Sequence, residues 1–140
     1  MNLDAHPDLR KGGRPLAVHD RVYIATKDLD AIESSTPKKK LLYRLMHCLN
    51  LVRKKDGFHF DSLEQEQYAR QGNGIFHWLP VSDELIHVKL VMEDGSARIG
   101  LAEPSLQTKK IGDIVQFERV CFARYDHDED SVKVFWYLHR

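Results

Sequence analysis

Histidine, cysteine and acidic side chains are the residues of this chain that could carry out chemistry. The 140-residue sequence has eight histidines, the cysteines Cys48 and Cys121, and an acidic cluster, DHDED, at residues 126–130. No His or Cys pair has the CxxC, HxxxH or HExxH spacing of a metal site, although a zinc site combining His47 or Cys48 with Cys121 and His127 stays open. The acidic cluster lacks the glycine and the distal glutamate of a calcium loop. We therefore expect no bound metal.

Sequence motifs of nucleotide-dependent and nucleophilic enzymes are missing. The sequence contains no GxGxxG, no GxxxxGK[ST] and no GxSxG. Cys121 could act as a nucleophile beside a histidine, but its position in an apolar row favours a buried, reduced thiol. We therefore expect no catalytic residue and no cofactor in this chain, with a small cysteine or metal enzyme as the remaining alternative.

Basic residues are concentrated in one part of a chain whose formal net charge is zero. Residues 1–60 hold 12 Lys/Arg against 7 Asp/Glu, whereas residues 61–140 hold 9 against 14. The stretch KKKLLYRLMHCLNLVRKK, residues 38–55, has seven basic side chains and no acidic one. Such a stripe could follow a phosphate backbone, or it could be a solvated face whose lysine stems cover apolar surface.

An arginine stands in an otherwise apolar row near the end of the chain. If residues 113–125 form one strand, Arg119 shares a face with the apolar residues at 115, 117, 121, 123 and 125. A guanidinium at such a place is either paired with a carboxylate, such as Glu103 or Glu118, or directed at a ligand. The residue types alone leave both alternatives open.

The pattern of turns and β-branched residues predicts an all-β fold of short antiparallel strands. We expect strands near residues 20–25, 41–53, 57–61, 74–79, 84–93, 96–102, 113–125 and 131–139. Two helices are expected over residues 27–33, with Thr26 as a cap, and 62–71, with Ser62 and Gln65 at capping-box spacing. Residues 33–40 are the best candidate for a mobile connection. Strands of this kind favour barrels or a sandwich, because closing a sheet removes its edges.

Composition places the chain among globular proteins, with 42% hydrophobic and 30% charged residues. It has no apolar run of the ~20 residues that a membrane-spanning helix needs, and MNLDAHPDLRKGG at the N-terminus has no apolar signal core. We expect a cytoplasmic monomer.

Five ordered segments resemble one family. They are HPDLRKGGR at 6–14, RLMHCLN at 44–50, FHWLP at 76–80, GLAEPSLQTKKIGDIVQFERVCFARYD at 100–126 and FWYLHR at 135–140. In this order they are similar to the anticodon-binding region of glutamyl- and glutaminyl-tRNA synthetases, above all the archaeal-type glutamyl enzyme. The resemblance implies two small antiparallel β-barrels: a proximal one of about residues 1–40 and 100–140, and a distal one of about residues 41–99.

The resemblance also implies which residues read RNA. The glutamine and arginine of the family's QFER segment contact the central anticodon base, a uridine, and correspond to Gln116 and Arg119. The strand over residues 44–54 lies where the family contacts the first and third bases, which makes Arg44 and Arg53, with Lys54 and Lys55, candidates. Of these, only Arg44 lies in a matched segment. Aromatic candidates for base stacking are Tyr43 and Tyr125, although core packing is favoured for both, and for Trp78 still more.

Two features of the resemblance lead to structural expectations. Residues three apart on a flat strand face opposite sides, so convergence of Gln116 and Arg119 requires a β-bulge or strong coiling between 116 and 121. The family usually has an acidic or amide residue where this chain has His47, and a glycine where it has Cys121. We expect Glu103-Pro104 to form a structural corner.

The chain is thus expected to recognise tRNA(Glu), without catalysis of its own. The complete enzyme would use ATP and magnesium to join glutamate to tRNA, with a catalytic domain that this sequence does not contain. Three alternatives remain at this point: acceptance of tRNA(Gln), a fragment of a glutaminyl-tRNA synthetase, and a stand-alone barrel that binds RNA or protein and no longer reads anticodons.

Overall fold

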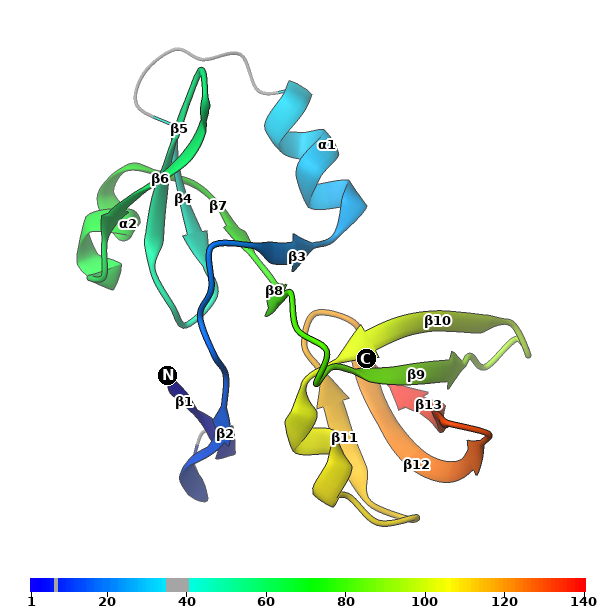
Figure 1. Cartoon of the computed structure of the whole chain (residues 1–140). Helices are drawn as coiled ribbons and strands as arrows, with labels where there is room; N and C mark the ends of the chain where they lie inside the picture. Colours follow the sequence, from blue (N-terminus) through cyan, green and yellow to red (C-terminus); the bar gives the residue numbers. More distant parts are fainter. Residues whose placement is uncertain (7, 35–40) are drawn as a thin grey trace. The chain divides into compact units, whose positions relative to one another are not determined.

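The computed structural model describes residues 1–6, 8–34 and 41–140 (Figure 1). Segments with alternating polar and apolar side chains form short strands in it. Strands predominate in this part of the chain, and two short α-helices accompany them, so the fold expected as all-β is a mainly β one. The expected mobile connection at 33–40 lies, from residue 35 on, outside the described residues. No described helix is long and apolar enough to pass through a bilayer.

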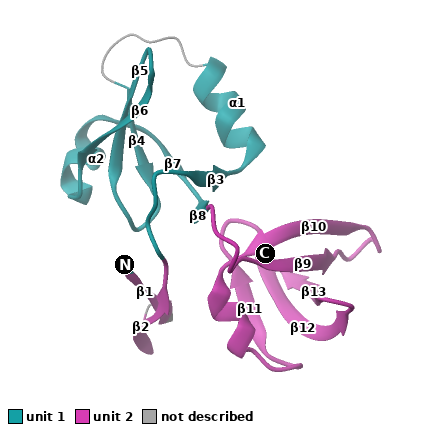
Figure 2. Cartoon of the chain, in the orientation of Figure 1, with its two compact units in different colours: residues 1, 17–80 teal, residues 2–16, 81–140 magenta. Residues whose placement is uncertain are grey.

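The described chain divides into two compact units (Figure 2). The first consists of residue 1 and residues 17–80, and the second of residues 2–16 and 81–140. Beyond residue 1, the chain therefore changes unit at 16–17 and 80–81, whereas the division drawn from the sequence lay near residues 40 and 99.

The first unit combines a four-stranded sheet with a small two-stranded one. The larger sheet has the order β6-β5-β4-β7, and the smaller pairs β3 with β8. Its core includes Ile32 from helix α1, Tyr43 from β4, Phe76 from β7 and Trp78 from β8. The elements are β3 (Val22–Ile24), α1 (Thr26–Ser34), β4 (Leu41–Leu45), β5 (Asn50–Lys54), β6 (Gly57–Ser62), α2 (Gln65–Gln71), β7 (Gly72–Phe76) and β8 (Trp78–Pro80).

The second unit is built on a curled five-stranded sheet of order β10-β9-β13-β12-β11 (Figure 1). Only β13 and β9 run parallel in it. Ala123 and Phe135 are fully enclosed in its core, and the β1-β2 hairpin belongs to the same unit. Its elements are β1 (Asn2–His6), β2 (Arg10–Pro15), β9 (Ile86–Val91), β10 (Ala97–Ala102), the 3-10 helix η1 (Pro104–Thr108), β11 (Ile114–Phe117), β12 (Cys121–Glu129) and β13 (Val132–His139).

Two segments expected as single strands are hairpins. Residues 41–53 break at 46–48 between β4 and β5, where His47 has φ +58°, and residues 113–125 break at 118–120 between β11 and β12, where Arg119 has φ +62°. The Leu45 amide donates to the Leu49 carbonyl just before β5 begins, so three residues separate this bonded pair. Three residues likewise separate Phe117 from its partner Cys121. An odd loop preserves the alternation of faces, and for this reason each hairpin looks like one strand in the sequence.

The expected start of the second helix was also wrong. Helix α2 begins at Gln65 with Glu64 at its N-cap position, and no side chain caps it. Ser62 instead ends β6, where its hydroxyl accepts a hydrogen bond from Asn50 Nδ2 at 2.9 Å and donates one to Asp61 at 2.8 Å. By contrast, Glu103 and Pro104 form the expected corner, with Pro104 at the first turn of η1.

Candidate nucleic-acid interface

The β11-β12 hairpin presents Arg119 at the tip of a tight turn. The Val120 amide donates to the Phe117 carbonyl at 2.9 Å and closes the turn, and Arg119 has a left-handed backbone with φ +62°. Few non-glycine residues adopt this conformation, and it costs on the order of 1 kcal/mol. Arg119 is exposed and is not a member of the apolar row that the sequence suggested.

The apolar row itself is real, but it is shared by two strands. Val115 and Phe117 of β11 pair with Ala123 and Cys121 of β12, and all four side chains contact the core. No bulge lies within β11, so the expected β-bulge between residues 116 and 121 was wrong. The bulge was expected because Gln116 and Arg119 could not converge from one flat strand. The turn removes this obstacle, since Arg119 lies in the loop and only Gln116 lies on the strand.

Gln116 and Arg119 line the same hollow on this hairpin. Its volume is about 250 Å³, and it is lined by Gln116, Phe117, Arg119, Val120, Cys121, Phe122 and Arg140. Gln116 and Arg140 are exposed, as is Arg119. The hollow therefore combines a carboxamide, two guanidinium groups and apolar walls, a set that can hydrogen-bond the edge of a planar polar ring and neutralise a phosphate.

Glu103, one of the two carboxylates expected as partners of Arg119, is bound by Arg14 of β2. Arg14 Nε donates to Glu103 Oε1 at 2.7 Å and Nη2 donates to Oε2 at 2.9 Å, while Nη1 lies 4.0 Å from Glu118 Oε1. The hydrogen bond to Glu103 raises the pKa of Arg14. Ser105 also donates a hydrogen bond to Glu103. These contacts fix β2 to the corner at η1.

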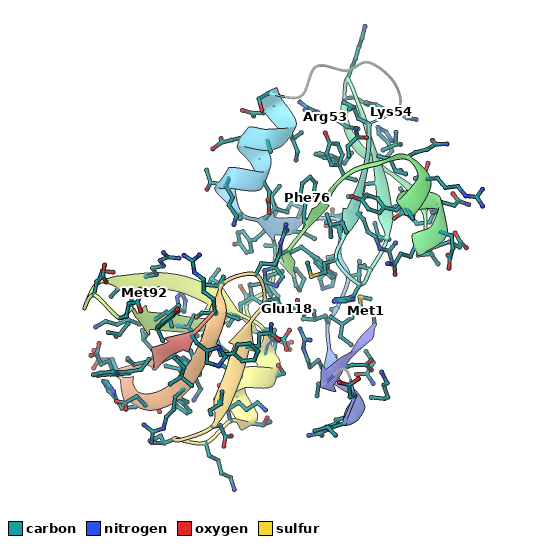
Figure 3. The ribbon with its side chains drawn as sticks, turned by 180° about the vertical axis from the view of Figure 1, so that it is seen from behind. Met1, Arg53, Lys54, Phe76, Met92 and Glu118 are labelled. Carbon is teal, nitrogen blue, oxygen red and sulfur yellow. The ribbon has the colours of Figure 1, made fainter. Side chains whose placement is uncertain are left out.

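The basic candidates in the first unit differ in exposure. Arg44 has only 8% of its surface exposed, and its Nη1 donates to Asn50 Oδ1 at 2.8 Å and to the Leu63 carbonyl at 3.1 Å. Arg53 is half-buried and donates to the Ile32 carbonyl at 2.8 Å. Lys54, beside it at the end of β5, is exposed (Figure 3). Residues 38–40 of the basic stripe lie outside the described residues.

The two tyrosines proposed for base stacking lie in hydrophobic cores, the alternative that the sequence favoured. Tyr43 stacks on Phe76 with ring centroids 5.0 Å apart, and Tyr125 stacks on Phe135 at 5.1 Å. The Tyr125 hydroxyl donates to Asp128 Oδ1 at 2.6 Å and accepts from Lys133 Nζ at 2.9 Å. Trp78 is likewise buried, and its indole donates to the Met46 carbonyl at 3.0 Å.

The aromatic residue that does line the hollow is Phe122, which was not among the sequence candidates. It pairs with Gln116 across the β11-β12 ladder, and its ring stacks on His139 of β13 at 4.8 Å. One sequence signal could have identified it. Phe122 has the parity of Gln116 and lies on the polar side of the strand, where a large aromatic side chain has no core to fill.

A larger hollow in the first unit has a different charge. It measures about 500 Å³ and is lined by Leu42, Asp61, Glu64, Glu66, Gln67, Arg70 and Gln71. Its three carboxylates would repel a phosphate backbone. This hollow is therefore a poorer candidate for RNA than the one beside Gln116.

The cysteines have the properties of structural thiols. Cys121 is buried in the core and Cys48 is half-buried, and burial raises the pKa of both thiols. A raised pKa favours the neutral thiol, whereas nucleophilic cysteines have a lowered one. Within the described residues, no three His, Cys, Asp or Glu side chains gather closely enough to hold a metal ion.

A family model matches the part of the chain that holds most of this hollow. The family described as "tRNA synthetases class I (E and Q), anti-codon binding domain" matches residues 75–126, which include the whole β11-β12 turn. The chain belongs to this anticodon-binding family. The QFER segment, with Gln116 and Arg119, lies inside the matched region.

Curated relatives extend the similarity to nearly the whole chain. The glutamate–tRNA ligase of Methanobrevibacter smithii is 36% identical over 130 residues, which cover 93% of this chain and 22% of that enzyme. The glutamate–tRNA ligase of Methanocaldococcus jannaschii is 32% identical over 145 residues, covering 100% of this chain and 25% of that enzyme. That of Natronomonas pharaonis is 33% identical over 136 residues, or 96% of this chain and 22% of the enzyme. The chain thus spans about a quarter of the length of these archaeal relatives.

Proposed function

We propose that this anticodon-binding chain recognises the anticodon loop of a glutamate tRNA, and that Gln116 and Arg119 contact the central uridine. The observation that carries the proposal is that both side chains line one hollow on the β11-β12 hairpin, within the segment that matches the family. Proteins read RNA sequence chiefly at unpaired bases, whose Watson–Crick edges are free. An anticodon loop presents three such bases.

The chemistry of the two side chains suits uracil. Uracil has two carbonyl acceptors and one N–H donor on its accessible edges, a guanidinium provides donors only, and a carboxamide provides both a donor and an acceptor. Together they can satisfy all three positions of uracil. Cytosine would place an amino group where a carbonyl is required, so that two donors would face each other.

Basic groups of the first unit would add contacts that do not depend on sequence. We propose Lys54, which is exposed, and Arg53, which keeps part of its guanidinium accessible, as partners of phosphates. Arg44 would reach RNA only through N–H groups other than the Nη1 that holds Asn50 and Leu63. Tyr43 and Tyr125 are not part of the proposed surface, because their rings complete the cores.

We propose glutamate tRNA, and not glutamine tRNA, as the ligand because the curated relatives are glutamate–tRNA ligases. By the same likeness, the two units would correspond to the distal and proximal barrels of that enzyme family. A complete enzyme of this kind would join glutamate to tRNA with ATP and magnesium. The described chain would contribute recognition of the anticodon.

The test is a fluorescence-anisotropy titration of the 140-residue chain with a labelled anticodon stem-loop of tRNA(Glu) and with the same stem-loop carrying cytidine at the central position. The wild type should prefer uridine. Arg119→Ala should lose about 1–3 kcal/mol of binding free energy with the uridine RNA and most of its preference. Lys109→Ala removes an exposed charge outside the hollow, so it should weaken both complexes equally.

Two results would contradict the proposal. If Arg119→Ala binds with unchanged affinity and preference, the hollow does not read the central base. If the wild type does not distinguish the two stem-loops at all, the chain is an RNA-binding or protein-binding relative without anticodon reading. Exchanging the third anticodon base for that of tRNA(Gln) separates glutamate from glutamine specificity.

A further inference from the structure

Three side chains form a row across the outer face of the curled sheet. Gln116 of β11 pairs with Phe122 of β12, and Phe122 pairs with His139 of β13. Neighbouring strands lie about 4.8 Å apart, so a carboxamide, a phenyl ring and an imidazole lie on adjacent strands of one sheet face. The row ends beside the hollow that Arg119 and Arg140 also line.

An irregularity in β13 places His139 in this row. Ala123 pairs with Tyr137 and Phe122 pairs with His139, which leaves Leu138 as an extra residue in the ladder. Tyr137 packs against the core. In a regular ladder, Phe122 would pair with Leu138 and not with His139. The bulge thus brings an imidazole onto the ring of Phe122, with centroids 4.8 Å apart and planes inclined by 27°.

The stack of Phe122 and His139 is partly open to solvent. Phe122 is half-buried and His139 is exposed, and the His139 Nδ1 lies 2.9 Å from the Arg140 carbonyl oxygen. His139 stacks on Phe122, and Phe122 also lines the hollow beside Gln116. Aromatic side chains in the wall of an RNA-binding hollow are the groups on which proteins stack unpaired bases.

We propose that Phe122 is the stacking platform for the base that Gln116 and Arg119 read, and that His139 is a positioning residue that holds the Phe122 ring upright. This inference rests on the proposed function and adds the contact with the face of the base to the contacts with its edge. Stacking makes the hollow prefer a flat, aromatic ring, and the hydrogen bonds select uracil among such rings. Arg140, at the rim, supplies donors for the phosphate of the same nucleotide.

The test compares uridine with 5,6-dihydrouridine at the central position of the anticodon stem-loop. Dihydrouridine keeps both carbonyls and the N–H of uracil but has a puckered ring that stacks poorly. Wild type should bind the dihydrouridine RNA at least about fivefold more weakly than the uridine RNA, since base stacking contributes about 1–3 kcal/mol. Dihydrouridine at another loop position is the RNA control for its effect on loop conformation.

The variants Phe122→Leu and Phe122→Tyr are the matched pair on the protein side. Leucine keeps an apolar side chain on the half-buried site but offers no planar face, so Phe122→Leu should bind the two RNAs within about twofold of each other. Phe122→Tyr should keep the wild-type ratio. Both variants should keep their preference for uridine over cytidine, because Gln116 and Arg119 are unchanged, and this separates the inference from the proposed function.

His139 is tested by rescue. His139→Ala should reduce the ratio between uridine and dihydrouridine RNAs, and His139→Phe should restore it, since a phenyl ring can replace the imidazole in the stack. The inference is overturned if Phe122→Leu retains the full wild-type ratio, or if His139→Ala and His139→Phe behave alike. If wild type shows no preference for uridine over cytidine, the proposed function fails first.

Discussion

The guanidinium of Arg14 and the carboxylate of Glu103 form a two-point ion pair, at 2.7 and 2.9 Å, between residues 89 positions apart. It joins β2 of the N-terminal hairpin to the η1 corner of the second unit, with side chains that are 23% and 16% exposed. Such paired hydrogen bonds between charged groups are stronger than neutral ones. The pair therefore ties this hairpin to the rest of the second unit.

We expect Glu103→Gln to destabilise the chain by about 1–2 kcal/mol, because one charge of the pair is removed and the Arg14 guanidinium keeps a poorer partner in a partly desolvated site. Urea unfolding followed by circular dichroism measures the effect. Glu93→Gln removes an exposed carboxylate of the same unit and should be close to neutral. Equal midpoints for the two variants would show that the pair contributes nothing.

Asn50 should be the most sensitive polar residue of the first unit. It is fully buried, accepts from Arg44, and donates to Ser62 Oγ at 2.9 Å and to the Glu64 carbonyl at 2.7 Å. Asn50→Ala leaves a buried guanidinium and two further groups without this partner, and should cost about 2–4 kcal/mol. Ser62→Ala removes one hydrogen bond and should cost about 1 kcal/mol.

These two variants are best compared by urea unfolding followed by Trp78 fluorescence in a Trp136→Phe background. Trp78 is buried in the first unit, and Trp136 is 53% exposed, so its replacement should be tolerated. A cost for Asn50→Ala no larger than that for Ser62→Ala would mean that Arg44 finds other partners.

Arg119 offers a way to separate backbone strain from recognition. Because its φ is +62°, glycine should fit the turn better than alanine, and Arg119→Gly should be about 0.5–1 kcal/mol more stable than Arg119→Ala. Both should lose the preference for a central uridine, since neither has a guanidinium. Thermal unfolding and the anisotropy titration, made on the same two proteins, check both expectations. Restored preference in the glycine variant would point to the turn conformation as the source of specificity.

His127 should make stability depend on pH. The hydrogen bond of Nδ1 to Asp126 Oδ2, at 2.7 Å, raises the pKa of His127, and Glu129, 3.4 Å from Nε2, acts in the same direction. A folded pKa above the unfolded value means that the contribution is fully present below about pH 6.5 and disappears as the pH rises through the folded pKa.

The measurement is the difference in Tm between wild type and His127→Gln. It should be largest near pH 5.5 and shrink toward about pH 8.5. Asp126→Asn removes the first cause of the shift and should flatten the profile. A difference in Tm that does not change with pH would show that His127 contributes through packing alone.

Sequence by itself determined the mainly β class, the apolar faces and the family, because alternation of side chains and ordered motifs are local properties of the chain. Val115, Phe117, Cys121 and Ala123 all face the core as their parity required. Local signals also predicted two other features. Helical residue preferences indicated the helix over Thr26–Ser34, and a proline at a helix start indicated the corner at Glu103-Pro104.

Only the tertiary structure decided where the strands turn and which side chains meet. Three-residue loops preserve the parity of the strands they join, and the left-handed positions at 47 and 119 hold histidine and arginine instead of glycine, so no pattern marked them. The burial of Arg44 against Leu63 and the approach of Phe122 to His139 depend on partners more than 15 positions away. Contacts of this kind follow from sheet register, which alternation alone does not fix.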